Sequence, residues 1–152
     1  MNYWLMKSEP SVFSIDDLRK VHTTGWDGVR NYQVRNMMRD QMRKGDLAFF
    51  YHSSCEVPGV VGIMEIAGPA RPDPTAFDPK SKYYDPGSSP EKPRWYLVDV
   101  RFKRKLRRVV TLEEMRGEKA LAGMQLLKRG NRLSITPVTK KEWDHILSME
   151  KA

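Results

Sequence analysis

The chain is poor in the residues that build metal centres and covalent catalysis. Its 152 residues include one cysteine, Cys55, and three histidines, so an internal disulfide is excluded and the usual zinc-ligand spacings are absent. His52 precedes Cys55 by three positions on an extended segment, but nothing there would orient the pair for nucleophilic attack. No phosphate-binding loop, dinucleotide-binding glycine motif or serine-hydrolase elbow occurs. We therefore expect no metal, no cofactor and no catalytic residue.

Long apolar runs are also missing. The longest, such as Leu47 to Tyr51, are a handful of residues, whereas a membrane-spanning helix needs roughly 20. The first residues lack the basic region, long apolar stretch and small-residue cleavage site that are typical of a signal peptide. We therefore expect a cytoplasmic protein with no membrane partner.

Acidic residues are outnumbered: 19 Asp and Glu face 27 Lys and Arg, which leaves a net charge of +8. Such a surplus favours a polyanionic partner, although it also keeps an ordinary protein soluble. The bases are concentrated in two places. Residues 30–44 contain five of them with Asp40 as the one acid, and residues 101–108 contain six with no acid.

The N-terminal half predicts short strands and two helices. Tyr3–Met6 is an apolar run that stops before Pro10, and Ser14 followed by Asp17 is a capping box for a helix to about Lys20. Apolar residues at helical spacing predict a helix from Tyr32 to Arg43, with three arginines on one face. Two buried strands are expected over Leu47–His52 and Gly59–Ile66.

The C-terminal half starts with a segment in which seven prolines between Gly68 and Pro93 forbid a helix or a central strand. Its aromatic residues predict a loop that is partly packed. The remaining expected elements are a strand over Trp95–Phe102, helices capped by Thr111 and Thr139, a short helix over Leu121–Leu127 and a strand over Leu133–Thr136. This order, and a length typical of one domain, predict a single α+β domain over residues 1–152 with a small mixed or antiparallel sheet, curled into a barrel.

One segment combines aromatic and polar groups in a way that suits a planar ligand. Trp26 to Gln33 places an indole, a glycine, a guanidinium and two amides within eight positions, which could stack on a flat ring and read its edge. A core position for Trp26 is the alternative. In the strand that follows, Phe50 and His52 share one face and Phe49, Tyr51 and Ser53 the other, so one face is expected in the core and the other at a pocket.

Several segments together resemble the EVE domain family, which includes the thymocyte nuclear protein 1 group and many small bacterial proteins. The resemblance spans nearly the whole chain and implies a PUA-like fold, a compact sheet barrel with peripheral helices related to the YTH and ASCH domains. It also implies a reader of modified, expected to be methylated, bases in DNA or RNA that catalyses no reaction. The matching segments are Tyr3–Pro10, Trp26–Gln33, Gly45–Ser53, Pro58–Gly62, Phe77–Pro79 with Tyr83–Asp85, Pro93–Trp95 and Gly130–Ser134.

The resemblance also implies where a base pocket would lie. Within it, we expect Trp26 to stack on the base, Ser8 and Asn31 to bond its Watson–Crick edge, and Tyr51 to form a second wall. The implied pocket residues are Lys7, Ser8, Glu9, Trp26, Arg30, Asn31, Tyr32, Tyr51, His52 and Ser53, closed by Trp95, Asn131 and Arg132. The expected phosphate contacts are Arg35, Arg39, Arg101, Lys103, Arg104 and Lys105.

Plainer interpretations remain open at this point. Lys7–Pro10 could be a capped turn, Gly130–Arg132 a tight connection, and the 101–108 run a solvated strand end. Two rival functions also remain. One is a nucleotide-directed hydrolase or transferase with Glu9 or His52 as base, and the other is a protein-interaction module that uses the proline-rich loop.

Overall fold

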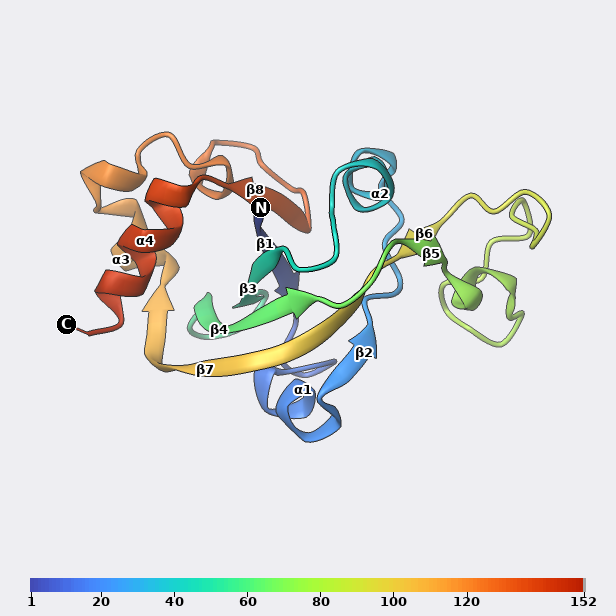
Figure 1. Ribbon diagram of the computed structural model, residues 1–152, viewed down its shortest axis with the longest axis horizontal. Coiled ribbons are helices and arrows are strands. Elements are labelled where there is room, and N and C mark those ends of the chain that lie inside the picture. Colours follow the sequence, from blue (N-terminus) through green and yellow to red (C-terminus); the bar gives the residue numbers. More distant parts are fainter. Residues whose placement is uncertain (152) are drawn as a thin grey trace.

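The computed structural model describes residues 1–151 and shows an α+β fold built on one curled, six-stranded sheet (Figure 1). The strand order is β2-β7-β4-β3-β1-β8; β1 and β3 run parallel, and the other neighbours are antiparallel. The expected fold class is confirmed. The strands are β1 (Tyr3–Ser8), β2 (Thr23–Gly25), β3 (Leu47–His52), β4 (Gly59–Ile66), β7 (Asp99–Thr111) and β8 (Ile135–Val138), with a separate pair β5 (Arg71–Pro72) and β6 (Tyr96–Leu97).

Four helices pack around the sheet, and three of them begin with the capping boxes that the sequence predicts. Ser14, Thr111 and Thr139 each accept a hydrogen bond from the backbone three residues on, and the acid at that position bonds back to the cap. The helices are α1 (Ile15–Val21), α2 (Tyr32–Asp40), α3 (Leu112–Arg116) and α4 (Lys140–Met149). Within residues 1–151, no helix has both the length and the apolar composition to cross a membrane.

The sheet curls because its long strand bends around the others. β7 has 13 residues and pairs with both β4 and β2, and its register against β4 shifts twice. Such irregularities raise the local twist of a strand. In Figure 1, β7 sweeps beneath β4 and β3, so that one end of the sheet reaches α3 and the other reaches β2. The basic run at residues 101–108 therefore lies within β7, which begins directly after Val98.

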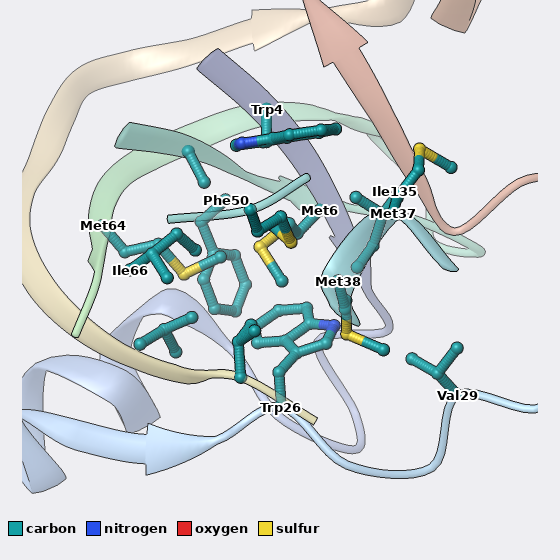
Figure 2. Packing of buried hydrophobic residues seen from close by; sticks show 14 of the residues in the cluster. Trp4, Met6, Trp26, Val29, Met37, Met38, Phe50, Met64, Ile66 and Ile135 are labelled. Carbon is teal, nitrogen blue, oxygen red and sulfur yellow. The ribbon is translucent and has the colours of Figure 1, made fainter. Parts of the chain in front are cut away.

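Both faces of the sheet are buried, each in its own core. Trp4, Met6 and Phe50 point into a cluster with residues of α1 and α2, drawn in Figure 2, while Leu5, Phe49 and Tyr51 point into a cluster with α3 and α4. This alternation follows from the two-residue period of a strand. The expectation that one face of β3 would open onto a pocket is therefore wrong, because α4 covers it.

Some predicted boundaries differ from the structure. α2 ends at Asp40 rather than Arg43, because the Asp46 carboxylate accepts hydrogen bonds from the Arg43 backbone and the Trp4 indole and turns the chain away. The expected helix at 121–127 is two 3-10 turns, Lys119–Leu121 and Gln125–Leu127, separated by Gly123. β8 includes Pro137, which an edge strand tolerates.

Trp26 belongs to the first core. Its side chain is 8% exposed and meets Phe50 edge to face at 5.5 Å, among Met6, Met38 and Ile66 (Figure 2). The indole thus fills the space between the sheet and α2. Because most of its surface is covered by protein, we assign Trp26 chiefly a packing role, and its stacking on a base stays a prediction.

We predict that Trp26→Ala lowers the free energy of unfolding by about 3–5 kcal/mol, because it leaves a large cavity between the sheet and α2. Urea denaturation followed by circular dichroism measures this loss. Val57→Ala is the matched control, since Val57 is 50% exposed and its truncation should change stability by under about 0.5 kcal/mol. Equal midpoints for the two variants would contradict the core position of Trp26.

Candidate nucleic-acid interface

A cleft of about 340 Å³ opens between the end of β1, the segment that joins β2 to α2, and the tip of the proline-rich loop. This volume lies within the range of small-molecule pockets. The cleft brings together segments that are far apart in the sequence. Its lining residues are Lys7, Ser8, Glu9, Val12, Phe13, Thr24, Gly25, Trp26, Asp27, Gly28, Val29, Arg30, Lys82, Tyr83 and Ser134.

The buried carboxylate of Asp73 holds two walls of the cleft together. It accepts hydrogen bonds from the Gly28 amide at 2.9 Å, from the Thr75 amide and hydroxyl at 2.9 and 2.6 Å, and from Arg30 at 3.1 Å. Burial by itself would raise the pKa of Asp73, but these hydrogen bonds outweigh it and lower the pKa below its ordinary value. Asp73 therefore stays ionised and fixes the loop against the Trp26–Arg30 segment.

Arg30 extends this connection to the tip of the loop. Its guanidinium donates to the Tyr83 carbonyl at 2.7 and 3.2 Å and to the Thr75 hydroxyl at 3.2 Å. It also lies 5.4 Å from the ring centres of both Tyr83 and Trp95. With these contacts and the ion pair to Asp73, Arg30 serves as a structural clamp that places Tyr83 at the cleft.

Gly28 lets the Tyr83 ring come close to the backbone. Its φ angle is +78°, and a Cβ atom at this position would lie 2.5 Å from the Tyr83 ring. Only glycine meets both requirements without displacing the ring. The position of the Tyr83 ring at the wall of the cleft therefore depends on Gly28. The sequence singled out the segment around Gly28 for its aromatic and polar side chains, not for this contact.

Five of the predicted pocket residues line the cleft: Lys7, Ser8, Glu9, Trp26 and Arg30. Two of them are already engaged, since the Ser8 hydroxyl donates to the Phe13 carbonyl at 2.6 Å and Arg30 is bound to the loop. The expected bond from Ser8 to a base edge is therefore replaced by a bond within the protein. Lys7 and Glu9 form no side-chain hydrogen bond or ion pair within residues 1–151 and remain available to a ligand.

The other predicted pocket residues do not line the cleft, and three of them have partners within the fold. Asn31 caps α2 by accepting from the Val34 amide, Tyr32 stacks on Trp95 at 4.8 Å, and the Trp95 indole donates to Asp85 at 2.7 Å. Tyr32 and Trp95 thus attach the loop to α2, and Asn31 begins that helix. They were predicted as pocket residues from the family resemblance, and that role stays a prediction.

Strand β3 likewise contributes none of its predicted pocket residues. Tyr51 is buried in the second core, where burial raises its pKa to about 12, so it cannot form a wall of the cleft. The His52 ring accepts a hydrogen bond from the Ile15 amide, and burial lowers its pKa. The backbone of Ser53 bonds to the Ser8 carbonyl. Asn131 and Arg132 lie on the connection before β8 and do not line the cleft.

Most of the expected phosphate contacts are bound to acids. Arg101 and Lys103 both pair with Glu65, Arg104 pairs with Glu150, and Lys105 pairs with Asp16. On α2, Arg39 pairs with Asp40, and Arg35 bonds to Asn36 and the Arg94 carbonyl. The basic run looked unbalanced in the sequence because its partners come from other elements.

The cleft also contains functional groups that the sequence analysis missed. Asp27, Lys82, Tyr83, Thr24 and Ser134 all line it. Asp27 and Tyr83 stood within matching segments and could have been found there. Ser134 likewise ends the matching segment Gly130–Ser134, whereas Thr24 carried no signal, since only the curled sheet brings β2 to the cleft.

Lys7 and Asp27 are charged groups of the cleft that are partly buried, and partial burial shifts the pKa of each. Partial burial lowers the pKa of Lys7, whose ammonium has lost part of its hydration. Burial, and then the charge of Asp73, raises the pKa of Asp27. The cleft therefore offers hydrogen-bond donors and acceptors that the protein itself does not use. No group of His, Cys, Asp and Glu within residues 1–151 is arranged to hold a metal ion.

The family model of the EVE domain matches residues 2–149. The chain belongs to the EVE domain family. It is 46% identical over 169 residues to mouse thymocyte nuclear protein 1, with 99% of this chain and 74% of that protein covered. A crystal structure of a Pseudomonas syringae protein matches with a TM-score of 0.94 at 47% identity, covering 97% and 99% of the two chains.

A second structural relative was solved with a ligand. It is human THYN1 in complex with DNA containing 5-methylcytosine, and it matches this EVE protein with a TM-score of 0.93 at 43% identity. The match covers 100% of this chain and 99% of that one. The family expected from the sequence segments is thereby confirmed.

These relatives correct the expected location. The names of the relatives contradict the prediction of a cytoplasmic protein, because the mouse, rat and human relatives are named as a nuclear protein. The physical reason is that the prediction rested on a missing signal-peptide pattern, which bears only on export. It does not distinguish the cytoplasm from the nucleus.

We predict that Asp73→Asn destabilises the fold by about 3 kcal/mol at neutral pH, because it removes the charge that Arg30 faces and weakens the bond to Gly28. Since the folded-state pKa of Asp73 lies below the ordinary value of 3.8, its contribution to stability is fully present above that pH. As the pH falls through the folded-state pKa, the wild type loses this contribution, and the difference between the two proteins should narrow. Urea unfolding at several pH values measures it.

Asp78→Asn is the matched control for that experiment. Asp78 lies in the same loop, is exposed and accepts one bond from the Lys80 amide. Its replacement should leave stability nearly unchanged at every pH. A similar loss in both variants would contradict the role of Asp73 in holding the loop.

Proposed function

We propose that this protein binds nucleic acid that carries a methylated base and holds this base, turned out of the strand, in the cleft. The observation that carries the proposal is the human relative solved with 5-methylcytosine DNA, which has the same architecture over the whole chain. Binding a base in a pocket requires it to leave the stack, at a cost of a few kcal/mol. DNA is the nucleic acid that this relative supports.

The cleft has the chemistry that such a ligand needs. The Tyr83 ring provides an aromatic surface at the wall, and Lys7 and Asp27 provide a donor and an acceptor. An amino-bearing pyrimidine presents both an N–H donor and ring or carbonyl acceptors on its Watson–Crick edge. In this proposal Tyr83 replaces Trp26 as the aromatic contact, and Lys7, Glu9 and Asp27 read the edge.

A role without catalysis is part of the proposal. The ring of His52, a candidate base, lies beside Phe50 on the face of the sheet that belongs to the first core. Its Nε2 atom accepts a hydrogen bond from the Ile15 amide, so the lone pair of this nitrogen is already used. Glu9 lines the cleft together with Lys7 and Asp27, but within residues 1–151 its side chain forms no hydrogen bond or ion pair with another acid or base. These contacts favour binding over the rival of a hydrolase or transferase.

The proline-rich loop favours the same conclusion over a protein-interaction module. Its residues are tied into the fold by Asp73, by Arg30 and by the pairing of Asp85 with Trp95 and Arg94. A loop with so many internal contacts serves as a wall of the cleft. A docking segment would instead expose a contiguous apolar patch, whereas in this loop Tyr84 is exposed and Phe77 and Tyr83 are partly buried.

We expect a DNA duplex with one 5-methylcytosine to bind more tightly than its unmethylated twin by about fourfold. This is the preference that burying one methyl group provides, at about 0.8 kcal/mol. Fluorescence anisotropy at fixed ionic strength measures both affinities. The matching RNA duplexes form a second pair. Equal affinity within both pairs would contradict the proposal.

A pair of adjacent tyrosines tests the position of the base. Tyr83→Ala should weaken binding to methylated DNA by about 5- to 150-fold, because it removes an aromatic contact worth about 1–3 kcal/mol. Tyr84→Ala is the control, since Tyr84 is 42% exposed and does not line the cleft. The same anisotropy assay reports both, and melting curves show that both fold. Equal losses would place the base elsewhere.

A further inference from the structure

The sequence draws attention to the basic run of β7, but the structure balances most of that charge. Arg101 lies 3.2 Å and Lys103 3.6 Å from the shared carboxylate of Glu65. Arg104 lies 2.5 Å from Glu150, and Lys105 lies 3.0 Å from Asp16. A phosphate at this strand would have to displace an acid from each of these bases.

A different stretch of the chain carries charge with no acid to balance it. No Asp or Glu occurs between Glu118 and Glu142, and Lys128, Arg129 and Arg132 lie within five positions in the middle of that interval. All three are exposed. Within residues 1–151, their side chains form no hydrogen bond, ion pair or ring contact. These three side chains, named here the basic turn, are thus free cations on the surface.

The basic turn is joined directly to the cleft. It leads into Ser134, which lines the cleft, and the Ser134 carbonyl accepts a hydrogen bond from the Lys7 backbone at 2.8 Å. Its backbone has a defined shape, because Gly130 adopts a φ of +79° and the Asn131 side chain accepts from the Leu133 amide. The three cations therefore stand on a turn of defined shape whose continuation, Ser134, lines the cleft and pairs with the Lys7 backbone.

We infer that the basic turn, and not the basic run of β7, binds the phosphate backbone that flanks the base held in the cleft. The inference rests on the proposed function, because it takes nucleic acid as the ligand. Free cations release the condensed counterions of a polyanion without first breaking an ion pair. A base seated beside Lys7 and Ser134 has its flanking phosphates within reach of long side chains on the adjoining turn.

The triple variant Lys128→Ala, Arg129→Ala and Arg132→Ala tests the inference. Its affinity for the methylated duplex is measured by anisotropy across a series of salt concentrations. Each lost phosphate contact lowers the slope of log affinity against log salt by about 0.9 for duplex DNA. We expect the slope to fall by about 2 to 3 relative to wild type.

The control is a second triple variant, Arg101→Ala, Lys103→Ala and Lys105→Ala, which removes the same formal charge from β7. Its slope should change by less than about 1, because its cations are paired with Glu65 and Asp16. Circular dichroism melts of both variants show whether each is folded. An unfolded basic-turn variant is replaced by Lys128→Gln, Arg129→Gln and Arg132→Gln.

The readouts separate the inference from the proposed function. The slope of log affinity against log salt reports on the basic turn. The ratio of affinities for the methylated and unmethylated duplexes reports on the cleft. A reduced slope with an unchanged ratio supports the basic turn. An unchanged slope, or an equal change in both triple variants, overturns it while leaving the methyl preference intact. Failure of the wild type to bind any duplex overturns both.

Discussion

The ion pair between Arg30 and the buried Asp73 is the contact on which the candidate site depends. It joins the Trp26–Arg30 segment to the proline-rich loop, with 3.1 Å between Arg30 Nη1 and Asp73 Oδ2. Both side chains also form hydrogen bonds with backbone groups of the two segments. A buried carboxylate is stable only when its charge is paired and its lone pairs are satisfied. The loop therefore has one position, and Tyr83 stands at the cleft because of it.

The two-sided sheet explains which residues remain for function. Helices cover both faces, so β1 up to Met6 and β3 up to Tyr51 are packed in one core or the other, and the end of β1 at Lys7 and Ser8 reaches the cleft. Aromatic residues such as Trp26 and Tyr51, which are attractive as ligand contacts by type, are used to fill these cores. Ligand-binding groups are left to the ends of strands and to loops, as is common where a rigid scaffold positions a site.

The basic residues are divided in a similar way between those paired within the fold and those left for a ligand. The surplus of +8 is a property of the whole chain, but its effect depends on where the acids lie in space. Glu65, Glu150 and Asp16 come from β4, the C-terminal end and α1, and each pairs with bases of a run that has no acid of its own. The turn before β8 has no such neighbours. The densest basic segment in the sequence is thus the less available one.

The amino-acid sequence by itself determined the family, the α+β class, the three capping boxes and the bounds of β3 and β4, because these depend on local patterns and on runs of matching residues. It also placed Lys7, Glu9 and Arg30 at the cleft. Only the tertiary structure decided that Tyr32 and Trp95 hold the loop, that Tyr51 is core, and that Ser134 and Tyr83 face the cleft. The physical reason is that hydrogen bonds and ion pairs between residues tens of positions apart depend on strand pairing and loop packing, which no local pattern records.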